Sequence, residues 1–414
     1  MLSGRDRWRV TDAEDDSAIG VTLGTDGLTL ASAAAPARVA APPDTLPLEP
    51  EVPTVSLPWG QVQMGDEVTA VATGHDCFAG GTRNGTVAVF ELDGTQRWQA
   101  KVGTWVLSLH FLGEGLLVGE DDGTLSRLDA SGNSVWSVNI PYAHIGWPHW
   151  SDQRSRIREI TAADIDGDGE REILVSNGDR RLYAFTGSGE QLWKKGVHWG
   201  VCIALTPTTY LGKFALFSGV TGPTLGGRVK IHDAQANLVG RLQISGMHSQ
   251  QIRDVRLFDL TGDGKREIVV ARDINSNQLV VCNEDRSLLW KADVGGSPDA
   301  LAIRSYEGAR QVLCGSRCGY VHAFEGATGH HLWFCYLGDE PRLLWPRADG
   351  SILAVCPSGS VVFAVGADGG LAGCETLPAP ITALLRPGQH RADPSCIPVG
   401  TNDGTIHVLE IGER

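Results

Sequence analysis

Apolar residues in this chain occur in short runs that alternate with polar positions and end at turns rich in Gly, Asn and Asp. Alternation with a period of two between such turns is typical of β-strands. A strand, a turn and a second strand are predicted eight times, at residues 80–90, 118–128, 175–185, 218–232, 270–282, 314–324, 354–365 and 399–409. No sustained helical periodicity competes with this pattern.

Each of these copies is part of a larger repeat. Another apolar run precedes the copy, and after several copies a short turn leads to a tryptophan, at Trp98, Trp136, Trp193, Trp290 and Trp333. The repeat is therefore four strands over about 40–55 residues, the period of a β-propeller blade. We predict an all-β propeller of eight four-stranded blades, in which the tryptophans pack between neighbouring blades.

The chain ends on the third strand of the last predicted blade, so a strand from elsewhere must complete it. Trp8, in the stretch GRDRWRV, is placed like the tryptophans of the other fourth strands. Residues 5–11 are therefore predicted to close the ring, which removes an exposed edge. Residues 18–32 form another predicted strand pair, either a decoration or part of the closure. This divides the chain into a closing strand with a Pro/Ala-rich connector (1–65) and a propeller (66–414).

Two acidic stretches, DIDGDGEREI (164–173) and DLTGDGKREI (259–268), each run into an apolar strand. They resemble the calcium loops of FG-GAP repeats, and the glycine turns followed by tryptophan resemble pyrroloquinoline-quinone-type propeller repeats. Together these resemblances cover roughly residues 66–414. They imply the fold and the metal loops but no particular activity.

The chemistry of the loops also points to calcium, which takes six to eight oxygen ligands. Gly167 and Gly169 permit the tight curl that brings alternate carboxylates together. The predicted ligands are Asp164, Asp166, Asp168, Glu172 and the carbonyl of Glu170 in the first loop, and Asp259, Thr261, Asp263, Glu267 and the carbonyl of Lys265 in the second. Two mainly structural sites are expected, the first tighter because it has one more carboxylate. The alternative is a pair of metal-free polar hairpins.

Both loops join the first strand of a blade to the second, and the opposite face collects histidine, arginine and tryptophan. The candidate ligand-binding residues are Trp105, His144, Trp147, His149, Trp150, Arg158, His198, Trp199, His248, Arg253 and Arg342. Tryptophan can stack on a sugar ring while arginine holds a carboxylate, so an anionic ligand such as a uronate is one interpretation. The other is that these residues only cover the channel, with arginines paired to Glu159 or Asp254.

The bulk composition narrows the classes of function. A net charge of -14 disfavours nucleic acids and anionic membrane surfaces as partners. No apolar run is long enough to span a membrane. The N-terminus has no apolar signal core, which favours the cytoplasm unless the chain is a mature or excised domain.

Two functional hypotheses remain. The favoured one is a non-enzymatic, calcium-stabilised scaffold that binds a protein or an acidic glycan, since motifs of common enzyme classes are missing. The alternative is a polysaccharide lyase, in which a histidine or tyrosine abstracts the proton beside a uronate carboxylate and arginine neutralises the enolate. Its candidates are His149, His198, His248, Tyr142, Arg158 and Arg253. Whether the chain is an enzyme is left open.

Overall fold

The computed structural model describes residues 8–11, 18–24, 27–32, 53–54, 57, 59–142, 155–196, 201–221, 228–243, 251–273, 277–385 and 396–410. The chain divides into two compact units, Met1–Glu51 and Val52–Arg414. The first unit holds a three-stranded antiparallel sheet of β1 (Trp8–Thr11), β2 (Ala18–Gly24) and β3 (Gly27–Ser32). No helix in the described part of the chain is long and apolar enough to cross a membrane.

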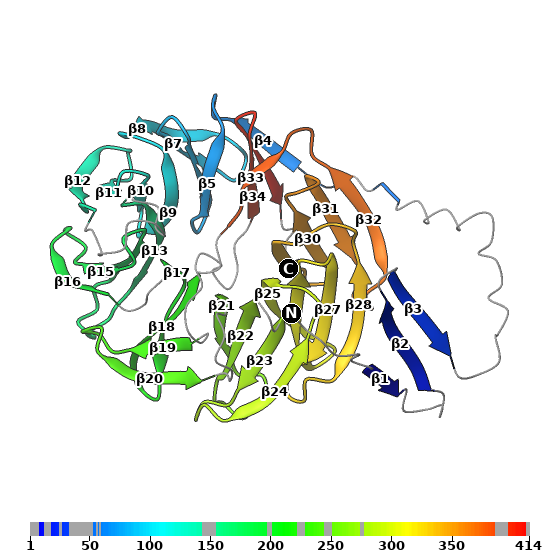
Figure 1. Ribbon diagram of the computed structural model, residues 1–414. Helices are drawn as coiled ribbons and strands as arrows, with labels where there is room; N and C mark the ends of the chain where they lie inside the picture. The colour runs from blue at the N-terminus through cyan, green and yellow to red at the C-terminus, as the bar shows by residue number, and fades with distance from the viewer. Residues whose placement is uncertain are drawn as a thin grey trace. The chain divides into compact units, whose positions relative to one another are not determined.

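The second unit is a ring of eight four-stranded antiparallel blades (Figure 1). Blades 1 to 4 consist of β5 (Val68–Thr73), β6 (Cys77–Thr82), β7 (Thr86–Glu91), β8 (Gln96–Lys101); β9 (Val106–Leu112), β10 (Gly115–Glu120), β11 (Thr124–Leu128), β12 (Ser134–Asn139); β13 (Ile157–Ala163), β14 (Glu172–Asn177), β15 (Leu182–Phe185), β16 (Gln191–Lys195); and β17 (Val201–Tyr210), β18 (Lys213–Thr221), β19 (Arg228–His232), β20 (Leu238–Gln243). Blades 5 to 7 consist of β21 (Gln251–Phe258), β22 (Glu267–Asp273), β23 (Gln278–Cys282), β24 (Leu288–Asp293); β25 (Pro298–Tyr306), β26 (Ala309–Ser316), β27 (Tyr320–Glu325), β28 (His331–Tyr336); and β29 (Leu343–Pro346), β30 (Ile352–Cys356), β31 (Val361–Val365), β32 (Leu371–Thr376). The predicted all-β propeller with eight blades is confirmed.

The eighth blade shows how the ring closes. It joins β33 (Ile381–Ala383), β34 (Cys396–Thr401) and β35 (Thr405–Glu410) to β4 (Trp59–Gln63), which pairs with β35 from Thr405↔Gln63 to Leu409↔Trp59. Closure by a strand N-terminal to the first blade is therefore confirmed, but the choice of residues 5–11 was wrong. Trp8 lies in β1 and pairs with Val21 of β2.

The burial of each strand follows its place in the blade. The second strands are flanked by neighbouring blades on both faces, and β6, β10, β14, β30 and β34 are buried at every residue. The fourth strands lie at the rim, where β8 alternates between exposed and more buried residues. Continuous apolar runs in the sequence thus mark strands buried on both faces, whereas alternation marks the outer strands.

Tryptophans of five fourth strands pack between their own blade and the next. The ring of Trp290 in blade 5 lies over Gly329, in the turn between β27 and β28 of blade 6, and its Nε1 donates to the carbonyl of Gly326 at 2.8 Å. A Cβ atom added to Gly329 would lie 2.5 Å from the indole. Trp98, Trp136 and Trp333 cover glycines of the following blades in the same way. The predicted packing role of these tryptophans is confirmed.

Candidate functional site

The first acidic loop lies between β13 and β14 and is organised by its own backbone. Asp164 accepts hydrogen bonds from the amides of Gly167 and Gly169, and both glycines have positive φ angles. Glu172 accepts from the amide of Ile165, and burial raises the pKa of this carboxyl. The curl predicted from the glycines is therefore present.

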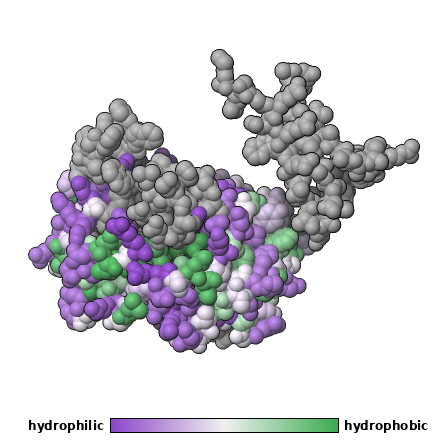
Figure 2. Space-filling model, turned by 60° about the horizontal axis from the view of Figure 1, so that its bottom comes forward, coloured by the Kyte–Doolittle hydropathy of each residue, from purple (hydrophilic) through white to green (hydrophobic). Residues whose placement is uncertain are grey.

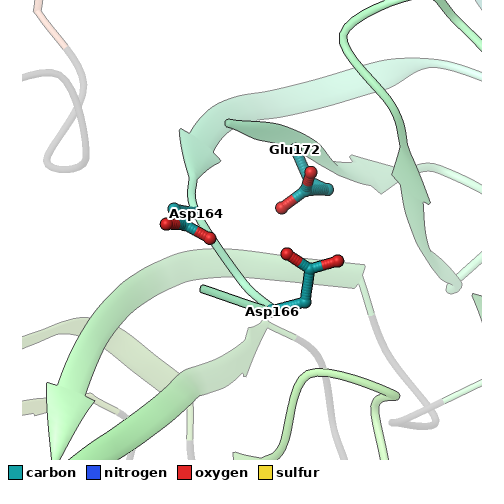
Figure 3. A group of neighbouring side chains, drawn as sticks. All are labelled: Asp164, Asp166 and Glu172. Carbon is teal, nitrogen blue, oxygen red and sulfur yellow. The ribbon is translucent and has the colours of Figure 1, made fainter. Parts of the chain in front are cut away.

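Three carboxylates of this loop, those of Asp164, Asp166 and Glu172, face a common point (Figure 3). One oxygen from each lies within 4.8 Å of the others. Calcium binds oxygens at about 2.3–2.6 Å, so two of its ligands are separated by at most about 5 Å. The geometry fits a calcium ion. The predicted ligand Asp168 is outside this group, and its carboxylate accepts from the amide of Glu170.

The second loop, between β21 and β22, has the same hydrogen-bond skeleton but a different charge balance. Asp259 accepts from the amides of Gly262 and Gly264, and Glu267 accepts from those of Leu260 and Thr261. Arg310 of blade 6 lies 3.0 Å from Asp259, and this hydrogen bond holds the pKa of the carboxyl below its ordinary value. The guanidinium group already neutralises one predicted ligand, so the first loop is the stronger candidate.

The structure describes only some of the ligand-binding residues predicted for the opposite face. His144, Trp147, His149, Trp150, His198, Trp199 and His248 lie outside the described residues. Tyr142 and Arg158 are half-buried. Trp105 lies under two guanidinium groups, those of Arg83 at 4.8 Å and Arg156 at 5.9 Å from its ring centroid.

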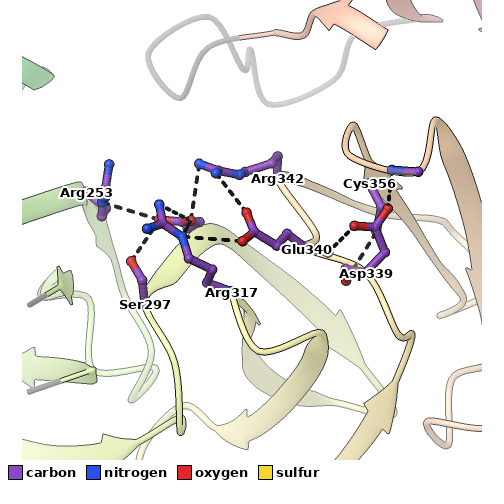
Figure 4. Close-up of polar contacts among 9 residues, drawn as sticks. Arg253, Ser297, Arg317, Asp339, Glu340, Arg342 and Cys356 are labelled. Atoms are coloured by element: carbon purple, nitrogen blue, oxygen red, sulfur yellow. Dashed lines mark hydrogen bonds and ion pairs between the residues drawn. The ribbon is translucent and has the colours of Figure 1, made fainter. Parts of the chain in front are cut away.

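Arg253 and Arg342 meet at one buried carboxylate, that of Asp299. Arg253 Nε lies 3.3 Å from its Oδ1, and Arg342 Nη1 lies 3.2 Å from its Oδ2. A third arginine, Arg317, places Nη2 3.1 Å from the same Oδ2. Figure 4 shows the three arginine side chains converging from neighbouring blades. The side chain of Asp299 is only 1% exposed, so this ion pair network is anchored inside the protein.

A second carboxylate completes the cluster. Glu340 lies 2.9 Å from Arg342 and 3.7 Å from Arg317. Ser297 adds a hydrogen bond of 2.9 Å to Asp299. Three arginines thus gather around Asp299 and Glu340, and the side chains of Arg317 and Arg342 remain 40% and 37% exposed. Exposed guanidinium groups of this kind have the donor geometry that binds a carboxylate or another anion.

A β-bulge explains why Arg253 and Asp299 reach the face of the propeller. The pairing of β21 with β22 skips from Ile252 to Asp254, and the pairing of β25 with β26 skips from Pro298 to Ala300. The skipped residues are Arg253 and Asp299, and Arg158 holds the same position in β13. A bulge re-aims the side chain of its extra residue. Asp254, which the alternative interpretation pairs with an arginine, accepts a hydrogen bond from Arg256 at 2.8 Å.

Sequence analysis missed three members of the arginine site, Asp299, Arg317 and Glu340. An alignment of the first strands of the blades would have placed Asp299 at the same position as Arg158 and Arg253. Arg317 lies in the turn between β26 and β27, a position that the repeat also fixes. The ion pairs themselves join residues of three blades that are far apart in sequence, so no short motif indicates them.

Comparisons with known proteins agree with this architecture. The family model described as outer membrane protein assembly factor BamB matches residues 83–264 and residues 121–342. A search of curated proteins found no match. Among solved structures, BamB from Moraxella catarrhalis is similar with a TM-score of 0.63 and 17% identity, over 88% of this chain and 98% of that one.

Two further solved structures share the fold. Sqt1 from Saccharomyces cerevisiae has a TM-score of 0.65 and 14% identity, over 85% of this chain and 98% of its own. The computationally designed Ika8 protein has a TM-score of 0.62 and 17% identity, over 84% and 98%. At these identities the likeness shows the fold alone, and propellers host unrelated activities.

Proposed function

The chain belongs to the family of the outer membrane protein assembly factor BamB, and from this we propose that it is a non-enzymatic scaffold that holds a partner protein against one face of its propeller. The family description names a factor in protein assembly, which supports a role in binding proteins. The regular blades require no catalysis, and their turns present side chains from several blades to one partner.

The arginine site of Arg253, Arg317 and Arg342 is the observation that carries this proposal. A protein of net charge -14 concentrates three guanidinium groups on one buried carboxylate and leaves those of Arg317 and Arg342 partly exposed. Arginine binds carboxylates through two parallel hydrogen bonds, with more geometric specificity than lysine. We propose that the partner protein contributes Asp or Glu side chains from an exposed segment.

Removal of one arginine should weaken this binding. For a fluorescein-labelled peptide of alternating Glu and Ser, Arg342→Ala or Arg253→Ala is expected to cost about 1.5–3 kcal/mol, the range for charge-assisted hydrogen bonds. That is about 10- to 150-fold in Kd, measurable by fluorescence anisotropy. Higher salt should also weaken the complex, because the arginines are partly exposed.

Arg310→Ala is the matched control. Arg310 is as exposed as Arg317, at 40%, but it pairs with Asp259 in the calcium-loop region on the other face. It should leave peptide binding unchanged. If wild type does not bind the peptide, or if Arg310→Ala weakens it as much as Arg342→Ala, the arginine site is structural.

An acidic glycan is the competing ligand of the same site. An oligogalacturonate that binds with the same dependence on Arg342, while acidic peptides do not bind, would replace the protein partner with a glycan. The lyase hypothesis depends on His149, His198 and His248, which lie outside the described residues. An assay for unsaturated uronate products on acidic polysaccharides tests it directly.

We also propose that calcium binds the first acidic loop and stabilises the hairpin of β13 and β14. The support is the convergence of Asp164, Asp166 and Glu172. A ligand that binds only the native state stabilises it by RT ln(1 + [L]/Kd), about 2.7 kcal/mol at about 100 times Kd. The second loop is proposed as a weaker site.

Thermal melting in calcium and in chelator should reveal this stabilisation. Asp166→Asn is expected to remove most of the calcium-dependent rise in melting temperature, because it removes a converging carboxylate. Asp263→Asn makes the same Asp-to-Asn change in the weaker loop, where Thr261 stands at the position of Asp166 and Asp263 at the position of Asp168, and it should leave most of the rise. An equal melting temperature with and without calcium, or an unaltered rise in Asp166→Asn, would contradict calcium binding at this loop.

A further inference from the structure

The outer strand of blade 6, β28, exposes three large apolar side chains. Leu332, Phe334 and Tyr336 alternate along it and are 40%, 60% and 56% exposed. On β27, Tyr320 pairs with Tyr336 and His322 pairs with Phe334. The rings of Tyr320 and Tyr336 lie 4.8 Å apart. We call these five residues the blade 6 edge patch. Figure 2 shows hydrophobic residues in green among hydrophilic ones in purple on one face of the protein.

The histidine of the patch belongs to its neutral surface. Burial lowers the pKa of His322 to about 4, so its ring is uncharged near neutral pH. His331 lies beside it with ring centroids 5.5 Å apart, and burial lowers the pKa of His331 too. The edge patch is therefore apolar and mainly aromatic, and it is uncharged near neutral pH.

Aromatic side chains at these positions are peculiar to blade 6. The strand registers align Phe334 and Tyr336 with residues of the other outer strands, which are Gln99 and Lys101, Ser137 and Asn139, Lys194, Arg241 and Gln243, Lys291 and Asp293, Cys374 and Thr376, and Gln61 and Gln63. Polar and charged residues on an edge strand prevent it from pairing with another chain. Blade 6 lacks this protection, and blade 7 has only Cys374 at the first of the two positions.

In blade 7, whose outer strand is also less protected, another part of the chain bonds to the edge. Thr54 forms a parallel bridge to Cys374, and the amide of Cys374 donates to the carbonyl of Pro53 at 2.9 Å. The amide of Leu57 donates to the side chain of Glu375 at 2.7 Å. Pro53, Thr54 and Leu57 of the propeller unit thus bond to this outer strand. Within the described part of the chain, β28 is the edge strand of its sheet and pairs only with β27.

We propose that the blade 6 edge patch binds an extended segment of a partner protein, which adds to β28 as a fifth strand and lays alternate apolar side chains on Leu332, Phe334 and Tyr336. An added strand pairs its backbone with the open edge, and pockets for every second side chain set the specificity. The segment is apolar because the patch has no charge to offer. None of the five patch residues belongs to the arginine site, and the proposed binding goes beyond the scaffold function proposed above.

The test uses the full chain and a fluorescein-labelled peptide of alternating valine and threonine with blocked, uncharged termini. Wild type is expected to bind it. The double variant Phe334→Gln, Tyr336→Lys copies blade 1 and should bind at least about 10-fold more weakly, on the scale of one lost large apolar contact. Both side chains are more than half exposed, so the melting temperature should stay the same. Phe334→Lys alone provides a second, milder variant.

Three results would overturn the proposal. They are no binding by wild type, equal binding by wild type and both variants, and equal weakening by Gln99→Ala in blade 1. Concentration-dependent self-association that both variants abolish would replace the partner segment with a second copy of this chain. Arg342→Ala should leave binding of this uncharged peptide intact, so failure here is distinguishable from failure of the arginine site.

Discussion

Asp299→Ala is expected to lower the free energy of unfolding by about 3 kcal/mol. Removing one partner of a buried ion pair typically costs about 3–5 kcal/mol, because it leaves the other charge unpaired. Here the cost should fall at the lower end, since the three arginines that remain reach solvent. Their mutual repulsion adds to the loss. Urea unfolding followed by circular dichroism measures it.

Glu340→Ala is the control for this prediction. It removes a carboxylate from the same cluster, but one whose side chain is 29% exposed. Exposed pairs typically contribute up to about 1 kcal/mol. Equal losses in the two variants would show that Asp299 does not anchor the three arginines.

Trp290→Ala should destabilise the propeller by about 3–5 kcal/mol, the usual cost of removing a large buried aromatic side chain. The indole is buried, contacts the next blade at Gly329, and donates a hydrogen bond to Gly326. Its loss opens a cavity between blades 5 and 6. Trp290→Phe should cost less, because it retains most of the apolar contact. Chemical unfolding of both variants measures the difference, and a loss below about 1 kcal/mol in Trp290→Ala would contradict the joining role.

The same contact can be tested from blade 6. Gly329→Ala must adopt a positive φ and also places its Cβ against the indole of Trp290. Gly338→Ala must adopt a similar φ, but nothing lies within 4 Å of its Cβ. Strain in the left-handed region costs about 1–2 kcal/mol. The loss of unfolding free energy should exceed that value in Gly329→Ala and should stay within it in Gly338→Ala.

The blades could be predicted because the strands and turns of each blade are contiguous in sequence and repeat at a regular period. The closing strand was not, and the reason is visible in β4. In the five blades whose fourth strand has a tryptophan, the register places it where blade 8 has Gly60, opposite Val408. Using tryptophan as the mark of a fourth strand therefore selected Trp8. Continuity of the chain with the first blade was the better guide.

The candidate sites divide in the same way. The first acidic loop is contiguous in sequence, and its curl follows from two glycines, so its convergence could be predicted. The arginine site joins Arg253, Asp299 and Arg342 from three blades. Sequence indicated that Arg253 and Arg342 lie at the same face, but it did not show which carboxylate they share. That depends on the bulge in β25 and on packing between blades.

Hydrogen exchange of the full chain, alone and with a protein partner captured by it, tests the scaffold hypothesis most directly. The prediction is slower amide exchange on binding in the segments around Arg253, Asp299, Arg317 and Arg342, and loss of that protection in Arg342→Ala but not in Arg310→Ala. Protection confined to the loops at 164–172 and 259–267, with no change around Asp299, would contradict the claim that the arginine site is the binding surface.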